Sequence, residues 1–121
     1  GVCYHLRWQV EAMEKKVKTS NVIRLVGGGA LAPLTCEILA DVLGKEVEVV
    51  ENPQNIGAVG AAVVTAVGLQ MIEDITEAEK LITIKKRYKP DRKNTLVYDE
   101  YFKVFKSLYQ NNRRSFAILN G

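Results

Sequence analysis

The chain has 121 residues, of which 47% are hydrophobic and 26% are charged, with a formal net charge of +3. This length excludes more than one domain but allows a real core, and the composition excludes a disordered segment or a small scaffold stapled by disulfides. The mild positive charge gives no independent indication of nucleic-acid binding. No charged-then-apolar leader opens the sequence, so we expect a cytoplasmic protein.

The first predicted element is an amphipathic helix over residues 2–17. Apolar residues recur at spacings of three and four, which mark one helical face: Val2, Leu6, Val10, Met13 and Val17. We place on the outer face the charged residues Arg7, Glu11, Glu14, Lys15, Lys16 and Lys18. Because this helix pattern opens the chain without a capping residue, we expect the chain to be a piece of a longer protein.

A strand, a glycine loop, a helix and a second strand follow. Residues 22–26 are typical of a buried strand in a parallel sheet. Pro33 suits the first turn of a helix, and Gly44 is typical of its end. We expect the inward face of that helix to carry Leu34, Ile38, Leu39 and Val42. Residues 47–50 form the second strand, so the segment is a strand-loop-helix-strand unit.

The second half of the chain predicts three helices and a basic loop. Residues 57–68 are small and uncharged, which indicates a helix buried on every side. Residues 76–82 predict a short helix with Thr76 as its N-cap. A basic loop covers 85–93, and a last amphipathic helix covers 96–112. We expect its buried face to include Val97, Tyr101, Val104, Phe105, Leu108 and Tyr109.

The glycine loop is the strongest candidate for a site. Gly27, Gly28 and Gly29 stand between an apolar strand and a helix, and Ala30 follows them. Missing side chains let a ligand approach the backbone, and unpaired N–H groups with the helix dipole favour an anion. The pattern therefore predicts a phosphate cradle, although ordinary strand-to-helix turns also use glycine.

Two other ligands fit parts of the sequence. Residues 27–32 satisfy G-x-G-x-x-A, the dinucleotide fingerprint, and Glu51 stands at the end of the second strand where that fingerprint places an acid. Glu51 is equally explained as a solvated strand end. The basic run 85–89 could contact nucleic-acid phosphates or a membrane surface, but a charge run in a loop is usually only solvated.

Other reactive or polar side chains have structural interpretations. Cys3 and Cys36 form no metal-ligand pattern, so we expect two reduced, buried thiols. His5 has no second ligand nearby and is interpreted as a surface or interface residue. Asp41 lies near the end of its helix, where an acid opposes the dipole, and this indicates a specific capping or interdomain partner.

Several segments together carry a family resemblance. They are Gly27-Gly28-Gly29-Ala30, Pro33-Leu34, Ile38 to Gly44 and Gly60-Ala61-Ala62, with the preceding helix and Tyr88-Lys89-Pro90-Asp91 near the end. In this order and spacing they resemble the C-terminal domain of the FGGY family of carbohydrate kinases, and within it the xylulokinase group. The resemblance covers nearly the whole chain.

The resemblance implies an α/β fold that is part of the actin-like, ribonuclease-H-like ATPase fold, with ATP held between two such domains. Residues 1–121 would be the C-terminal, nucleotide-side domain of a larger two-domain sugar kinase. By position, Gly27, Gly28, Gly29 and Ala30 would contact the phosphates and ribose, with Mg²⁺ bridging the phosphates. The family often has a polar pair where this chain has Leu31-Ala32, so we expect backbone contacts to dominate.

The resemblance also implies what this chain lacks. The sugar site, the aspartate base and a second phosphate loop belong to the N-terminal part of such a kinase, so we expect no catalytic residue and no metal ligand here. The expected partners are ATP or ADP, and a sugar through the missing domain, with no nucleic acid and no membrane. A homodimer of the full-length protein is allowed. A non-catalytic actin-like nucleotide-binding module remains the alternative, besides the dinucleotide-binding domain.

Overall fold

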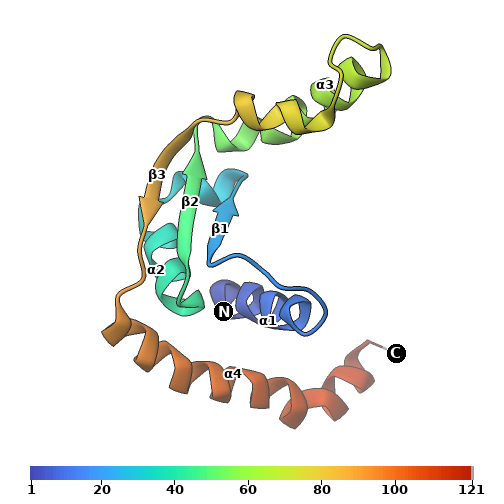
Figure 1. Cartoon of the computed structure of the whole chain (residues 1–121). Helices are drawn as coiled ribbons and strands as arrows, with labels where there is room; N and C mark the ends of the chain where they lie inside the picture. Colours follow the sequence, from blue (N-terminus) through green and yellow to red (C-terminus); the bar gives the residue numbers. More distant parts are fainter. Residues whose placement is uncertain (121) are drawn as a thin grey trace.

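The computed structural model describes residues 1–120, which form a small sheet with one helix packed against a face and the other helices beyond its two ends (Figure 1). The helices are α1 (Val2–Glu14), α2 (Pro33–Leu43), α3 (Ile56–Gly68) and α4 (Arg92–Leu119). The strands are β1 (Val22–Leu25), β2 (Glu46–Val50) and β3 (Ile84–Tyr88). Three 3₁₀ helices lie between them: η1 (Gly28–Leu31), η2 (Pro53–Asn55) and η3 (Ile75–Leu81). The expected α/β class is therefore confirmed.

The sheet has the strand order β1-β2-β3, with β1 and β2 parallel and β3 antiparallel to β2. Val47 and Val49 of β2 are buried in one core cluster with Cys36 and Leu39 of α2. Residues 85–93 were expected to form a basic loop, and this was wrong for the first part of that segment. Residues 84–88 pair with β2, so Lys85, Lys86 and Arg87 lie on a strand.

Both ends of α2 are as the sequence predicted. Pro33 occupies the first turn, where its missing N–H leaves no helical bond unmade. Gly44 ends the helix with a φ of 63°, in the left-handed region that favours glycine. Its Cα also lies close to α4, because a Cβ there would stand 3.3 Å from the Thr95 methyl group.

Helices α1 and α4 are held together by an aromatic cluster. Tyr4 lies between Tyr98, Phe102 and Phe105, with ring centroids 5.4 to 6.2 Å apart. Phe102 is among the most deeply buried side chains of the described residues. Trp8 contacts Phe105 edge to face at 6.3 Å. These aromatic contacts hold α4 beside α1 (Figure 1).

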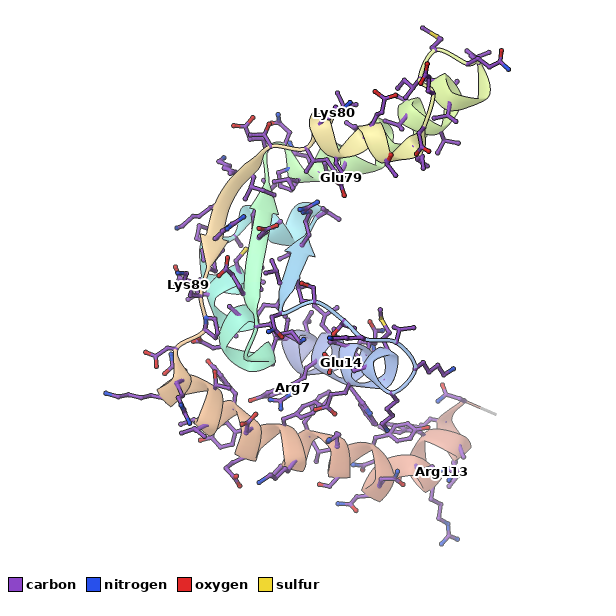
Figure 2. The ribbon with its side chains drawn as sticks, in the orientation of Figure 1. Arg7, Glu14, Glu79, Lys80, Lys89 and Arg113 are labelled. Atoms are coloured by element: carbon purple, nitrogen blue, oxygen red, sulfur yellow. The ribbon has the colours of Figure 1, made fainter. Side chains whose placement is uncertain are left out.

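Arg7 was expected on the outer face of α1, and this was wrong. Its side chain points between α1 and α4 (Figure 2). Its guanidinium donates to the Val42 carbonyl oxygen at 2.9 Å and pairs with Asp99 at 2.7 Å. It also lies 4.3 Å from the centroid of Phe102. The predicted apolar face is partly correct. Leu6 packs against the core, but Val2, Met13 and Val17 are exposed, because α1 also turns Tyr4, Arg7 and Trp8 toward α4.

Asp41 has the specific partner that its position indicated. Its side chain is buried near the end of α2 and accepts hydrogen bonds from the Asp91 N–H at 2.7 Å and from Asn94 Nδ2 at 2.8 Å. Both donors belong to the first turn of α4 or the residue before it. The carboxylate therefore fixes the start of α4 on the end of α2.

Helix α3 differs most from expectation. It was expected to be buried on every side, but Val63 is its only buried residue. With η3, α3 projects from the end of the sheet rather than covering it (Figure 1). Together α3, the sheet and α1 form an arch, and the unpaired edge of β1 faces its concave side. An uncharged helix in this position exposes apolar surface that a soluble chain normally covers.

The remaining boundaries shift for local reasons. Asp74, not Thr76, caps η3, because its side chain accepts from the Thr76 N–H at 2.7 Å. Asp91 caps α4, which begins earlier and ends later than the expected 96–112. The face of α4 expected to be buried is mostly wrong: only Phe105 of that set is partly buried, and the others are exposed, namely Val97, Tyr101, Val104, Leu108 and Tyr109. Among residues 1–120, no helix is long and apolar enough to cross a membrane.

Candidate functional site

The glycine loop lies where β1 ends and the turn into α2 begins. Gly27 has φ 86° and ψ −174°, a backbone conformation that side chains other than glycine rarely adopt. Its N–H donates to the Pro53 carbonyl oxygen at 2.8 Å, which ties the loop to η2 beside the end of β2. Gly27 therefore shapes and anchors the loop.

Gly28 and Gly29 are the open part of the loop. Both are exposed, and a Cβ at either position would meet nothing within 4 Å. Within residues 1–120 their N–H groups donate to no backbone or side-chain acceptor. Two free N–H donors with open space beside their Cα atoms can approach an oxygen-rich ligand closely.

Ala30 is the buried end of the loop. It is buried, its N–H donates to the Gly27 carbonyl oxygen at 3.1 Å, and its own carbonyl accepts the Cys36 thiol at 3.7 Å. The loop thus brings together all four residues that the sequence indicated. It gives them different positions: Gly28 and Gly29 outward, Gly27 and Ala30 inward.

The N-terminus of α2 follows directly and is not capped by a side chain. Ala32 is the N-cap residue, and no acidic side chain lies in the first turn. The first N–H groups of a helix have no partner within it, so this end presents positive potential. Leu31 and Leu34 flank it with side chains 59% and 67% exposed, although Leu34 was expected to face inward.

Cys36 lies beneath the loop as a structural residue. Its side chain is fully buried, and burial raises the pKa of the thiol above its usual 9.0. A thiol held neutral in this way is a poor nucleophile and a poor metal ligand. Cys3 is only partly buried, contrary to expectation, and both cysteines are free.

A pocket of about 250 Å³ adjoins the loop on the α2 side of the sheet. Its lining residues are Ala30, Leu31, Pro33, Val49, Pro53, Lys85, Lys86 and Tyr88. Lys86 Nζ lies 4.6 Å from the centroid of the Tyr88 ring, which holds this ammonium over the pocket wall. Sequence reasoning missed these lysines as neighbours of the loop, since only the pairing of β3 with β2 brings them there.

The other candidates do not join the loop. His5 is exposed on α1 and lies 3.0 Å from Gln9, so it remains a surface residue. Glu51, the acid of the dinucleotide interpretation, is exposed after β2. Among residues 1–120, no group of three or more His, Cys, Asp or Glu side chains could hold a metal ion.

The comparisons with known proteins agree on one family. Residues 1–69 match the model of the FGGY family of carbohydrate kinases, C-terminal domain. The chain is 24% identical over 120 residues to a xylulose kinase from Staphylococcus epidermidis, covering 98% of this chain and 24% of that protein. It is 33% identical over 96 residues to an autoinducer-2 kinase from Salmonella paratyphi B, covering 78% of this chain and 17% of that protein.

The fold agrees as well. A ligand-bound xylulose kinase from Lactobacillus acidophilus superposes with a TM-score of 0.86 at 18% identity, over 98% of this chain and 24% of that one. The chain thus spans about a quarter of the length of the relatives that it matches. Its architecture is part of the actin-like, ribonuclease-H-like ATPase fold, as expected.

The matched region, residues 1–69, contains α1, the glycine loop, α2, β2 and α3, which is more than half of the chain. The resemblance proposed from the sequence is therefore confirmed. This chain belongs to the FGGY family of carbohydrate kinases, as a part of its C-terminal domain.

Proposed function

We propose that residues 1–121 are the C-terminal, nucleotide-side part of a two-domain kinase that transfers the ATP γ-phosphate to a sugar hydroxyl. The observation that carries this proposal is the pair of free N–H groups at Gly28 and Gly29, open to solvent beside the uncapped start of α2. Phosphoryl transfer depends mainly on positioning and on charge neutralisation, which a loop without reactive side chains can supply.

The four loop residues have two different roles in the proposed binding of ATP. The N–H groups of Gly28 and Gly29 donate to phosphate or ribose oxygens, while Gly27 and Ala30 hold the loop in the conformation that presents them. The exposed side chains of Leu31 and Leu34 border the adenine through apolar contact. Lys85 and Lys86 add positive potential on the far side of the loop.

Mg²⁺ does not fit a site made by this chain alone. The described residues offer no cluster of carboxylates, and magnesium needs carboxylate or phosphate oxygens. We therefore assign the metal ligands, the general base and the sugar site to the rest of the protein. When bound by the rest of the protein, the ion would supply positive charge for the ATP phosphates.

The residues that would bind the sugar lie outside this chain, so the named relatives suggest the substrate. The named relatives are a xylulose kinase and an autoinducer-2 kinase, so D-xylulose is the first substrate to test and other polyols follow. With D-xylulose as substrate, the enzyme would act in xylose metabolism in the cytoplasm, where ATP is available.

The decisive experiment uses the full-length protein in a coupled assay with ATP and D-xylulose. Gly28→Ala and Gly29→Ala place a methyl group where the ligand approaches but touch nothing in the protein. We expect the KM for ATP to rise about tenfold, the loss of one or two neutral hydrogen bonds, with the sugar KM unchanged. Gln110→Ala is the control, since Gln110 is exposed on α4, far along the chain from the loop.

Two results would count against the proposal. An unchanged KM for ATP in both loop variants would remove the loop from the nucleotide site. Binding of NAD tighter than ATP or ADP to the unmodified protein would favour the dinucleotide-binding alternative instead.

We also expect the isolated chain to be inactive with D-xylulose and ATP, because the general base and the sugar site are assigned to the rest of the protein. Turnover above a protein-free blank would contradict that assignment.

A further inference from the structure

The glycine loop is held at two points, one on each side of its open part. At its start, the Gly27 N–H donates to the Pro53 carbonyl oxygen at 2.8 Å. Near its end, the Ala30 carbonyl oxygen accepts a hydrogen bond from the Cys36 thiol at 3.7 Å. Gly28 and Gly29, whose N–H groups are proposed to bind nucleotide, lie between these two attachments.

Cys36 supplies the side chain that holds the loop. Residues 27–32 carry no polar side chains of their own. Apart from the thiol bond, the hydrogen bonds that hold this loop among residues 1–120 join backbone groups. Backbone bonds are compatible with most residue types, whereas a side-chain bond depends on the residue that makes it. A substitution of Cys36 can therefore release the loop without altering the loop's own sequence.

The Ala30 carbonyl depends on this partner. Ala30 is buried, and its carbonyl stands near the C-terminal end of η1, where a helix leaves acceptors without intrahelical donors. Pro33 follows three residues later, and its nitrogen has no hydrogen to donate. A buried carbonyl without a donor costs free energy, so loss of the thiol favours a movement of the loop toward water.

The thiol keeps both its place and its proton. Cys36 is fully buried and belongs to the same core cluster as Ala30, Val49 and Tyr88. Close packing in this cluster fixes the position of the sulfur relative to the sheet. Burial also raises the pKa of the thiol, so the S–H donor is retained at neutral pH.

We propose that Cys36 is a positioning residue for the nucleotide, whose thiol holds the Ala30 carbonyl inward and so keeps the N–H groups of Gly28 and Gly29 aimed at the ligand. This inference rests on the proposed function of the loop. Helix η1 spans only Gly28–Leu31, so a shift of the Ala30 carbonyl turns the whole element. The two free N–H groups at its start then change direction, and a small misplacement of donors weakens binding.

The competing explanation is that Cys36 only fills the core. Two substitutions separate the hydrogen bond from the packing. Cys36→Ala removes both the donor and most of the buried volume, whereas Cys36→Val removes the donor and keeps the space filled. Cys36→Ser keeps a donor, although the C–O bond is shorter than the C–S bond and the hydroxyl reaches less far.

The test is the Kd for ATP of the full-length protein, measured by titration calorimetry, which needs no sugar substrate. We expect Cys36→Ala and Cys36→Val each to raise the Kd about threefold, the effect of losing one weak hydrogen bond. Cys36→Ser should recover part of this loss. The rise in unfolding temperature caused by saturating ATP should shrink in the same order.

Leu39→Val is the matched control for a purely structural effect. Leu39 is buried in the same core cluster, about one turn further along α2. Shortening this side chain should lower the unfolding temperature of the free protein at least as much as Cys36→Val does. The Kd for ATP should nevertheless stay that of the unmodified protein, because the loop keeps its thiol bond.

The outcomes separate this inference from the proposed function of the loop. If Gly28→Ala weakens ATP binding while neither Cys36→Ala nor Cys36→Val does, the loop binds nucleotide and the positioning role is overturned. If Cys36→Ala alone weakens binding, or if Leu39→Val weakens it equally, packing controls the loop and the positioning role is again overturned. If Gly28→Ala has no effect either, the proposed function fails and this inference fails with it.

Discussion

Gly27 shows how a single residue fixes the loop that we propose to bind nucleotide. Its positive φ turns the chain out of β1, and its N–H bond to Pro53 holds the turn against η2. Gly28 and Gly29, by contrast, have ordinary negative φ and open surroundings. Glycine therefore stands at Gly27 because of its backbone conformation, and we propose that it stands at Gly28 and Gly29 because a ligand approaches them.

This difference makes a prediction about stability. Gly27→Ala should lower the free energy of unfolding by about 1–2 kcal/mol, because alanine is strained at this φ. Gly28→Ala should leave stability nearly unchanged or raise it slightly, since its φ suits alanine. Urea unfolding of the two variants measures both effects. Equal destabilisation by both would contradict the division of roles.

Cys36 makes a prediction about pH. Burial raises the pKa of its thiol in the folded protein, so above pH 9.0 the unfolded chain loses this proton first. The unfolded state then binds fewer protons, and stability falls as the pH rises toward the folded pKa. Unfolding titrations from neutral to alkaline pH should show a steeper loss for the unmodified chain than for Cys36→Ala. Identical slopes would show that the thiol ionises equally in both states.

At the scale of elements, the central feature is the fastening of α4 to α2. Asp41 accepts from Asp91 and Asn94, while Asp91 in turn accepts from the Lys93 N–H at 2.8 Å and caps α4. A second contact, Arg7 with Val42 and Asp99, links α1 to both helices. The three helices are thus positioned by a few polar contacts around a small aromatic core.

Removing the carboxylate should loosen this joint. Asp41→Ala leaves two donors near the helix ends without their acceptor, and we expect a loss of about 1–3 kcal/mol in the free energy of unfolding. Asp41→Asn retains one acceptor oxygen and should cost less. Thermal unfolding followed by circular dichroism provides the comparison. A smaller loss for alanine than for asparagine would mean that packing, not hydrogen bonding, dominates at this position.

At the scale of the whole molecule, α3 indicates that the arch is incomplete. Thirteen residues without a charge form this helix, yet Val59 and Val64 are 37% and 59% exposed. The chain also spans about a quarter of its relatives' length. Under the proposal that the rest of a two-domain kinase covers α3, this surface is a domain contact, and the isolated chain should associate through it.

A single substitution tests that contact. Val64→Asp should destabilise the full-length protein by about 3 kcal/mol or more, because it buries an unpaired charge against the covering segment. The same change should have little effect in the isolated chain. Gln70→Asp, at an exposed position just beyond α3 with φ 58°, is the control. Equal effects of Val64→Asp in both forms would show that α3 stays exposed in the full protein.

The sequence by itself determined the elements whose signals are local. Pro33 and Gly44 delimit α2 because their backbone preferences act within one turn, and Gly27 opens the loop because its positive φ favours glycine. The family resemblance rests on the same local signatures in their order, and it was confirmed.

Only the tertiary structure decided which faces are covered. Apolar periodicity shows that α1, α3 and α4 each have surfaces to bury, but not which partner buries them. Arg7 lies inside because two helices converge on it, and Lys85 to Arg87 form a strand because β2 offers an edge. Val97, Tyr101 and Val104 of α4 stay exposed because a different face of the helix, with Phe102, takes the contacts with α1. These outcomes depend on long-range neighbours, which a local pattern cannot specify.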